Sequence, residues 1–268
     1  LFCFNSEYTT ALAAASNYLI TRSIYDKEYI PTLLEYCLKN DINIIVSLFD
    51  IDLLVLSKNI NLFKSNGIDL ILAPSDKIEI CNDKWKTYNF IKDNNFNTPK
   101  SYIDINNLID DLNDQKIFFP IIIKPRWGMG SLGLFFANNI DELVLLSKKC
   151  NQLINDTYLK FESSFTPDKS ILYQEVIKGD EFGLDIVNDL NCRYVTCFAK
   201  QKVKMRAGET DLGLTVDANV FKKTAKKLSD LILHKFILSV DVFVSNNQIY
   251  IIEMNCRISG HYPVSHIA

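Results

Sequence analysis

Hydrophobic residues in the first third of the chain alternate between helical and extended spacing. Apolar positions recur every three or four residues over 29–39, which predicts a helix, and a β-branched run at 42–48 predicts a buried strand. A second helical pattern covers 52–63, and a second strand pattern covers 69–73. Strands that alternate with helices are typical of a parallel sheet. We therefore predict a doubly wound α/β unit over about residues 1–80.

The pattern changes after Pro74, where strands and helices no longer alternate regularly. In chain order we expect a helix at 83–92, a strand from about 100, a helix at 106–113, strands at 117–124 and 132–137, a helix at 141–153, strands at 170–177, 181–187 and 193–199, a helix around 221–232 and a hairpin at 238–255. A polar connector at 155–169 divides this set. The later strands look antiparallel, so the second part of the chain is predicted to be α+β.

The composition limits the class of protein. The chain has 268 residues, and 29 Lys and Arg residues against 32 Asp and Glu residues give a formal net charge of −3. Proteins that bind nucleic acid through phosphate contacts usually carry a clear excess of positive charge, so no nucleic-acid partner is expected. Apolar residues make up 48% of the chain, which excludes a disordered or fibrous protein.

The seven cysteines are scattered, with no Cys-x-x-Cys motif and no ligand-like spacing to the three histidines. We interpret them as reduced thiols of a cytoplasmic protein rather than as a disulfide framework or a zinc site. No apolar run approaches the roughly 18 residues of a membrane span, so no membrane partner is expected. The first residues have the pattern of a strand rather than that of a signal peptide.

A glycine-rich segment follows the predicted strand at 117–124. Gly128, Gly130 and Gly133 match the pattern G-x-G-x-x-G, but a dinucleotide-binding fingerprint requires a helix directly after it. Residues 134–137 have a strand pattern instead, which is typical of a flap over nucleotide phosphates. Lys124 ends the apolar strand before the loop, so it either reaches solvent or meets an anion, and its position favours the anion.

Polar residues at alternating positions end the last predicted strand. Glu253, Asn255 and Arg257 point to one side if the strand persists. Asp241, on the preceding strand, joins that face only if the hairpin has an odd-numbered turn or a bulge, because a two-residue turn places it opposite Ile252. Carboxylate and amide oxygens are suitable ligands for Mg²⁺, so this face is a candidate metal site.

Five further residues carry weaker signals. Glu175 precedes a short turn, and Glu181 opens the next strand. Each acid either caps an exposed strand edge or contacts a nucleotide. Lys202, Lys204 and Arg206 alternate along one strand and are either a solvated basic edge or contacts for a substrate carboxylate.

The order of these motifs resembles the ATP-grasp superfamily, and within it the large subunit of carbamoyl phosphate synthetase and its relatives. The resemblance covers about residues 25–262. The matching segments are Asp83-Lys84, the strand 119–125 with its glycine loop, 174–181, 207–211 and 252–260.

This resemblance implies a Rossmann-like pre-ATP-grasp domain at 1–80 and a two-lobed ATP-grasp domain at 81–268, with lobe A at about 100–170 and lobe B at about 171–268. Residues 1–5 resemble the second strand of such a first domain. We therefore expect that an N-terminal strand is missing and that the C-terminus is truncated.

The resemblance also implies roles for single residues. Lys84 and Lys124 would contact ATP phosphates beneath the flap, Arg257 would stabilise an acyl phosphate, and Arg206 would meet the substrate carboxylate. The remaining implied nucleotide contacts are Gly128, Gly130, Ser131, Gly133, Glu175, Val176 and Glu181, and the implied ligands for Mg²⁺, or alternatively Mn²⁺, are Asp241, Glu253 and Asn255.

The implied activity is that of an ADP-forming ligase, which joins a small carboxylate to an amine or similar nucleophile through an acyl phosphate. The alternatives are a bicarbonate-phosphorylating enzyme of the carbamoyl phosphate synthetase or biotin carboxylase type, and a non-catalytic ATP-binding module. A homodimer is compatible with each of these. Cys256 stands where relatives usually carry proline, and His261 and His266 lie where substrate-side residues are expected, although isolated histidines are more often structural.

Overall fold

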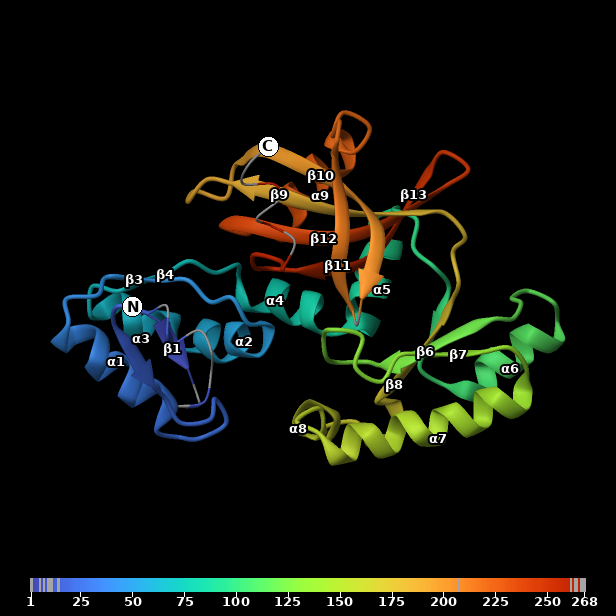
Figure 1. The fold of residues 1–268 in the computed structure, drawn as a ribbon, viewed down its shortest axis with the longest axis horizontal. Helices are drawn as coiled ribbons and strands as arrows, with labels where there is room; N and C mark the ends of the chain where they lie inside the picture. The colour runs from blue at the N-terminus through green and yellow to red at the C-terminus, as the bar shows by residue number, and fades with distance from the viewer. Residues whose placement is uncertain are drawn as a thin grey trace.

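A computed structural model describes residues 2–4, 6, 8, 12–13, 15–206, 208–260, 262 and 265, without the side chains of residues 2–4 and 209. Figure 1 shows the chain as three groups of elements: an N-terminal group in blue, a small sheet in green and yellow, and a larger sheet in orange and red. The fold class expected from the sequence, α/β followed by a two-lobed α+β arrangement, is confirmed.

The N-terminal group contains two short pairs of parallel strands with helices beside them. The strands are β1 (Phe2–Phe4), β2 (Tyr18–Ile20), β3 (Ile44–Ile45) and β4 (Asp69–Leu70), and the helices are α1 (Tyr29–Lys39), α2 (Asp50–Lys58) and α3 (Ile60–Ser65). The single helix predicted at 52–63 is wrong, because Asn59 ends α2 and begins α3. The Asn59 side chain donates to the Val55 carbonyl oxygen at 2.9 Å, which offers the backbone an alternative to continued helix.

Two helices connect this group to the first sheet. They are α4 (Ser75–Asn82), which was missed, and α5 (Lys84–Asp93), which was predicted. The α4 segment is strongly polar, with only Ile78 and Cys81 buried, so its apolar pattern is too weak to predict a helix.

The first sheet has four antiparallel strands. Its order is β5 (Ser101–Tyr102), β8 (Ile171–Glu175), β6 (Ile121–Pro125) and β7 (Phe135–Ala137). The helices α6 (Ile105–Asn113) and α7 (Ile140–Asp156) pack with it into one core, in which Ile121, Ile123 and Leu143 are fully buried. The polar connector expected at 155–169 contains the short α8 (Lys160–Ser163) and a 3₁₀ turn at Pro167–Lys169.

The second sheet has five antiparallel strands. Its order is β11 (Glu209–Val216), β10 (Tyr194–Arg206), β9 (Asp180–Asn188), β12 (Phe236–Ser245) and β13 (Gln248–Asn255). The helix α9 (Lys222–Ile232) buries Ala225, Leu228 and Ile232 against it, as the spacing predicted. Strand β11 was missed, and β10 is longer than expected.

The chain passes from the first sheet to the second at residues 176–179, because β8 belongs to the first sheet and β9 to the second. Gly179 lies so close to Val244 that an added Cβ would stand 2.2 Å from the Val244 carbonyl oxygen. A larger residue there would push the connector and the start of β9 away from β12.

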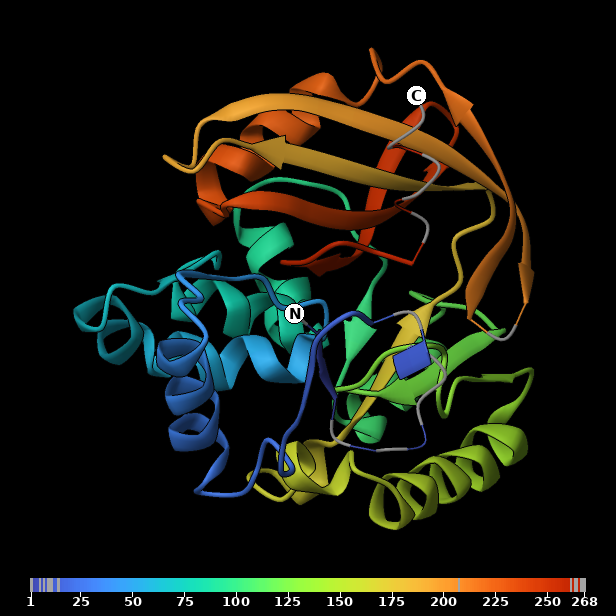
Figure 2. The same ribbon diagram turned by 60° about the vertical axis from the view of Figure 1, so that its left-hand side comes forward.

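The sheets meet again at the glycine loop. Figure 2 shows the β10–β11 hairpin extending from the second sheet toward the loop between β6 and β7. At the hairpin tip, a Cβ on Gly208 would lie 2.6 Å from the Gly130 carbonyl carbon. Backbone contact therefore closes the space between the sheets at this point.

Other expectations concern the chain as a whole. The six cysteines whose side chains are described are unpaired, as expected for thiols. Within the described residues, none of the helices combines the length and apolar character needed to span a membrane.

Candidate active site

Asp241 and Glu253 stand opposite each other on β12 and β13. The hairpin turn holds two residues, Asn246 and Asn247, and would by itself place Asp241 opposite Ile252. A register shift between the Asp241 and Val242 pairs inserts Ile252 as a bulge, so that Asp241 pairs with Glu253 instead. The prediction that the two acids require a bulge or an odd-numbered turn is confirmed.

Two lysines neutralise these acids. The Lys202 ammonium lies 2.8 Å from Asp241 and 2.9 Å from Glu181, and its side chain is only 5% exposed. The Lys84 ammonium lies 3.6 Å from Glu253. Although burial acts to lower it, the charges of Asp241 and Glu181 raise the pKa of Lys202 above its ordinary value. The face therefore attracts positive charge.

The chemistry of this face fits a magnesium ion. Asp241, Glu253 and Asn255 supply carboxylate and amide oxygens, and Asn255 pairs with Ser239 next to the acid pair. Among the described residues, no three His, Cys, Asp or Glu side chains converge as a preformed metal cluster. A bound ion would share these few protein ligands with other oxygen donors, as Mg²⁺ commonly does with phosphate and water.

Lys124 is buried at the end of β6. Its ammonium donates to Gln174 Oε1 at 2.8 Å, and Gln174 in turn donates to Ser101 Oγ at 2.9 Å. Burial lowers the pKa of Lys124 to about 8, although the charges of Glu253 and Asp241 act in the opposite direction. No carboxylate among the described residues lies within ion-pair distance of this ammonium, so it keeps its charge available for an anion.

The glycine loop joins two strands, as predicted for a flap. Residues 126–134 connect β6 to β7, which pair antiparallel, and no helix follows the loop directly. Gly128, Gly130, Ser131 and Gly133 all have positive φ angles, so the loop turns repeatedly. The Lys84 ammonium donates to the Gly128 carbonyl oxygen at 2.5 Å, which links α5 to the base of the flap.

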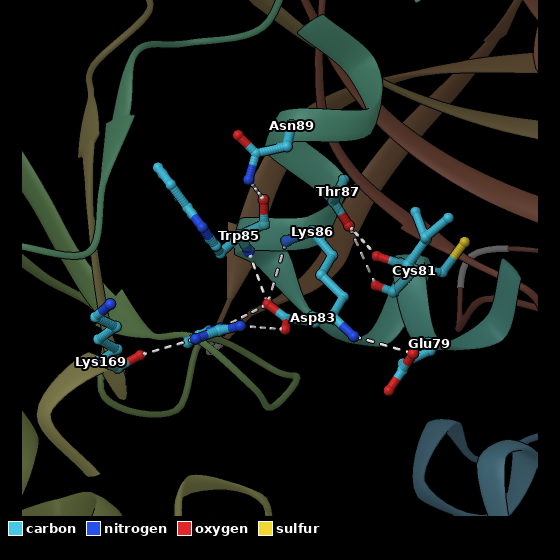
Figure 3. A network of polar contacts seen from close by, with 10 residues as sticks. Glu79, Cys81, Asp83, Trp85, Lys86, Thr87, Asn89 and Lys169 are labelled. Carbon is cyan, nitrogen blue, oxygen red and sulfur yellow. Dashed lines mark hydrogen bonds and ion pairs between the residues drawn. The ribbon is translucent and has the colours of Figure 1, made fainter. Parts of the chain in front are cut away.

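Asp83 and Arg126 form an ion pair that the sequence did not reveal. The Arg126 guanidinium donates through Nε and Nη2 to Asp83 at 2.7 and 2.6 Å, and both side chains are buried. Figure 3 shows Asp83 at the start of α5, where it also accepts hydrogen bonds from the backbone of Trp85 and Lys86. The same carboxylate thus caps the helix that carries Lys84 and fixes the strand end after Lys124.

The predicted adenine and ribose contacts lie at the passage between the sheets. Glu175 accepts a hydrogen bond from the Lys100 backbone N–H at 3.1 Å, so one of its oxygens joins β8 to the segment before β5. Val176 follows as the first connector residue and is partly buried. Glu181 lies on β9 and is held by Lys202. Lys202 thus links Glu181 to the acid face, whereas Glu175 already has a structural partner.

Arg257 follows β13 and is paired with a residue of the N-terminal group. Its Nε and Nη2 donate to one oxygen of Asp50 at 2.8 and 2.5 Å, and its Nη1 donates to the Ile258 carbonyl oxygen. Burial raises the pKa of Asp50, although the Arg257 charge opposes that shift. Asp50 was not singled out in the sequence, because a single acid at a helix start has no distinguishing pattern.

Arg206 lies apart from the residues above. Its side chain is 79% exposed and makes an ion pair with Asp211 at 3.1 Å across the β10–β11 hairpin. Lys204 pairs with the same acid, whereas Lys202 points to the acid face. A register shift in β10 separates Lys202 from Lys204, so the three cations do not act as one row.

A cavity of about 760 Å³ adjoins this site. Lys84, Gly128, Glu253 and Asn255 line one end of it, while α2 and the segment around α8 form its walls. His261 and His266 lie outside the described residues.

Comparison with protein-family models also divides the chain into an N-terminal part and an ATP-grasp part. A model of the ATP-grasp domain matches residues 81–261, and a model of the PylC-like N-terminal domain matches residues 3–71. The chain therefore belongs to the ATP-grasp family, as its motifs indicated.

Individual relatives are distant. The carbamoyl phosphate synthase large chain of Thermoanaerobacter sp. (strain X514) is 22% identical over 209 residues, which cover 74% of this chain but only 18% of the relative. Coenzyme gamma-F420-2:alpha-L-glutamate ligase of Methanocaldococcus jannaschii is 25% identical over 73% of this chain and 65% of its own length. The biotin carboxylase domain of 2-oxoglutarate carboxylase from Hydrogenobacter thermophilus has a TM-score of 0.75 at 16% identity, covering 99% of this chain and 60% of that one. These likenesses establish the fold.

Proposed function

We propose that this protein is an ATP-dependent, ADP-forming ligase that joins a carboxylate to an amine through an acyl phosphate. The observation that carries the proposal is the meeting of a buried lysine, a second lysine, a glycine flap and a face of oxygen ligands around one space. Lys124 and Lys84 supply positive charge, and Glu253 lies 3.6 Å from the Lys84 ammonium. Phosphoryl transfer depends mainly on positioning and charge neutralisation of this kind.

The nucleotide would lie between the two sheets. Lys84 and Lys124 would hold its phosphates under the flap formed by Gly128, Gly130, Ser131 and Gly133, with Glu175, Val176 and Glu181 toward the adenosine. Asp241, Glu253 and Asn255 would hold Mg²⁺, which neutralises phosphate charge when bound. The solved biotin carboxylase domain contains MgADP, which supports this choice of cofactors.

The chemistry balances in two steps. A carboxylate oxygen of the substrate attacks the γ-phosphorus, the bond to the β–γ bridging oxygen breaks, and ADP leaves. The amine nitrogen then attacks the acyl carbon, phosphate leaves with the bonding electrons, and the new amide nitrogen loses a proton. Arg257, two of whose nitrogens donate to Asp50, would stabilise the acyl phosphate. Arg206 lies on the exposed hairpin and would reach the substrate carboxylate only from the β10–β11 tip.

The proposal is tested by incubating the protein with ATP, Mg²⁺ and a library of carboxylates and amines. Release of ADP and phosphate that requires one member of each class supports it, whereas AMP and pyrophosphate would contradict it. Hydrolysis of ATP that depends on bicarbonate alone would favour the carbamoyl phosphate synthetase or biotin carboxylase type. Tight ATP binding with no turnover would favour a non-catalytic module.

Two further expectations belong to this proposal. We expect the protein to be cytoplasmic, because it would consume ATP and because its described thiols are unpaired. A homodimer is one arrangement to test, since the solved biotin carboxylase domain is described as a dimer.

A further inference from the structure

The cavity of about 760 Å³ lies between the N-terminal group and the ATP-grasp part of the chain. Figure 1 shows α2 and α8 on either side of the region below α4. Its size falls within the range of about 300–1,000 Å³ that is usual for small-molecule sites.

This cavity is distinct from the proposed nucleotide site but shares its edge. Lys84, Gly128, Glu253 and Asn255 line both, at the point where the phosphoryl group would be transferred. Of the described residues assigned to the nucleotide, Lys124, Glu175 and Glu181 do not line the cavity. A molecule bound there would therefore meet the reacting end of the nucleotide and leave the adenosine space free.

Two buried oxygens of residues that line the cavity lack hydrogen-bond donors. Asp50 directs one oxygen to Arg257, while its Oδ1 has no partner among the described residues. Asn82 donates through Nδ2 to the Asp50 carbonyl oxygen at 2.9 Å, while its Oδ1 is also without a described partner. Buried acceptors without donors are costly, and a positively charged N–H group would stabilise either of them.

The opposite part of the cavity is apolar. Leu54 and Val55 of α2 face it from one side, and Phe161 and Phe165 line it from the other. Tyr25 stacks on Phe161 with ring centroids 4.1 Å apart and donates to Glu162 at 2.7 Å, so α8 is held to the segment before α1 in the N-terminal group. Such walls suit a hydrophobic body of several carbon atoms.

We propose that this cavity binds the amine substrate, that Asp50 and Asn82 hold its ammonium group, and that Leu54, Val55, Phe161 and Phe165 hold a bulky apolar body. The substrate class is thus a primary amine with a hydrophobic side group, rather than ammonia or a small polar amine. That the bound amine is a substrate rests on the proposed function, whereas its binding is argued from the cavity alone.

The first test measures binding to the full chain by isothermal titration calorimetry at pH 7, without turnover. The probes are 2-phenylethylamine, its neutral counterpart 2-phenylethanol, its acidic counterpart 3-phenylpropanoate, and methylamine, which lacks the apolar body. We expect 2-phenylethylamine to bind at least tenfold more tightly than the other three. Equal binding of all four, no binding, or preference for the carboxylate would overturn the inference.

Matched variants localise the binding. Asn82→Ala removes one acceptor, and Asn94→Ala is its control, because Asn94 also donates to a backbone carbonyl near a helix end but does not line the cavity. Phe165→Ala removes an exposed ring from the wall, and Phe118→Ala removes a similarly exposed ring elsewhere. We expect each cavity variant to weaken 2-phenylethylamine binding at least threefold and each control to leave it unchanged. Loss of affinity in the controls, or none in the cavity variants, would contradict the proposed position.

A turnover assay separates this inference from the proposed function. Selective binding of 2-phenylethylamine without ADP release in any mixture would leave the cavity assignment standing and reject the ligase. ADP release that is equally fast with methylamine and 2-phenylethylamine would support the ligase and reject the cavity assignment.

Discussion

Asp50 and Arg257, which are 207 positions apart in the sequence, form an ion pair that joins the start of α2 to the end of the final hairpin. Both side chains are at most 14% exposed. The last motif of the ATP-grasp part is therefore oriented by the N-terminal group, and that group contributes directly to the candidate active site.

The Asp50–Arg257 pair should show strong coupling in a double-mutant cycle. Removal of either partner leaves a buried charge, so Asp50→Ala and Arg257→Ala should each lower the free energy of unfolding by about 3 kcal/mol, and the double variant by much less than the sum. Urea unfolding of the four proteins measures this coupling. The exposed pair Lys226–Asp230, 2.9 Å apart on α9, is the control, with an expected coupling below about 0.5 kcal/mol. Similar coupling at both sites would show that Asp50 and Arg257 are solvated.

Lys124→Met should remove ATP binding while leaving the fold intact. Burial lowers the pKa of this ammonium to about 8, and we propose that it binds an anion rather than supporting the core. Removal of a buried charge should stabilise the protein, whereas removal of the donor to Gln174 should destabilise it. Because these effects oppose each other, the free energy of unfolding at pH 7 should change by less than about 2 kcal/mol. Calorimetry with ATP and Mg²⁺ should show at least a tenfold weaker affinity.

The pH dependence of stability provides a second measurement on Lys124. Because the folded protein binds this proton less tightly than the unfolded chain does, the free energy of unfolding of the wild type should rise between about pH 8 and pH 10.5 relative to Lys124→Met. Parallel curves for the two proteins over this range would mean that Lys124 is solvated.

Asp52→Asn should stabilise the protein at neutral pH. Burial raises the pKa of Asp52 from 3.8 to about 6, so the folded state binds its proton more tightly than the unfolded state does. The stability that this proton provides is complete below about pH 3.8 and is lost as the pH rises through 6. Relative to the wild type, the Asn variant should therefore gain about 1–3 kcal/mol above pH 6 and less at pH 4.5, measured by urea unfolding. A constant difference between the two proteins at both pH values would contradict the assignment.

The cysteines should differ in reactivity. Cys81 and Cys256 are buried with their sulfur atoms 3.5 Å apart, and the contact with Cys256, together with burial, raises the pKa of Cys81. Cys192 is partly exposed. Iodoacetamide at pH 8 should therefore label Cys192 at least tenfold faster than Cys81, as measured by peptide mass spectrometry. Full labelling of both in urea is the control, and equal rates in the native protein would show that the Cys81–Cys256 contact opens readily.

The sequence could predict those parts of the site that depend on local pattern. The alternation of faces in a strand was enough to require either a bulge or an odd-numbered turn if Asp241 is to face Glu253, and the strand pattern after Gly133 was enough to predict a loop between two strands. The ion pairs Asp83–Arg126 and Asp50–Arg257 could not be predicted, because they join segments at least 43 residues apart. The cavity could not be predicted either, because its walls come from α2 and the segment around α8, which are far apart in the sequence.

The exposed position of Arg206 also could not be predicted from the sequence. Strand alternation alone places Lys202, Lys204 and Arg206 on one face, but the register shift in β10 sends Lys202 to the acid face and leaves Arg206 beside Asp211. Arg206 is therefore held by Asp211 on the exposed hairpin. Arg206→Ala should lower the rate of ADP release by less than threefold, and a larger loss would show that this side chain contacts the substrate.

The proposed reaction is the formation of an acyl phosphate between Lys124 and the face formed by Asp241, Glu253 and Asn255. It is tested most directly with a carboxylate labelled with ¹⁸O on both oxygens, supplied with ATP, Mg²⁺ and the amine that supports turnover. Mass spectrometry of the products should find one ¹⁸O atom in inorganic phosphate and none in ADP, and Glu253→Gln should abolish this transfer while the variant remains folded. Label in AMP, or unlabelled phosphate released at the rate of amide formation, would contradict the account.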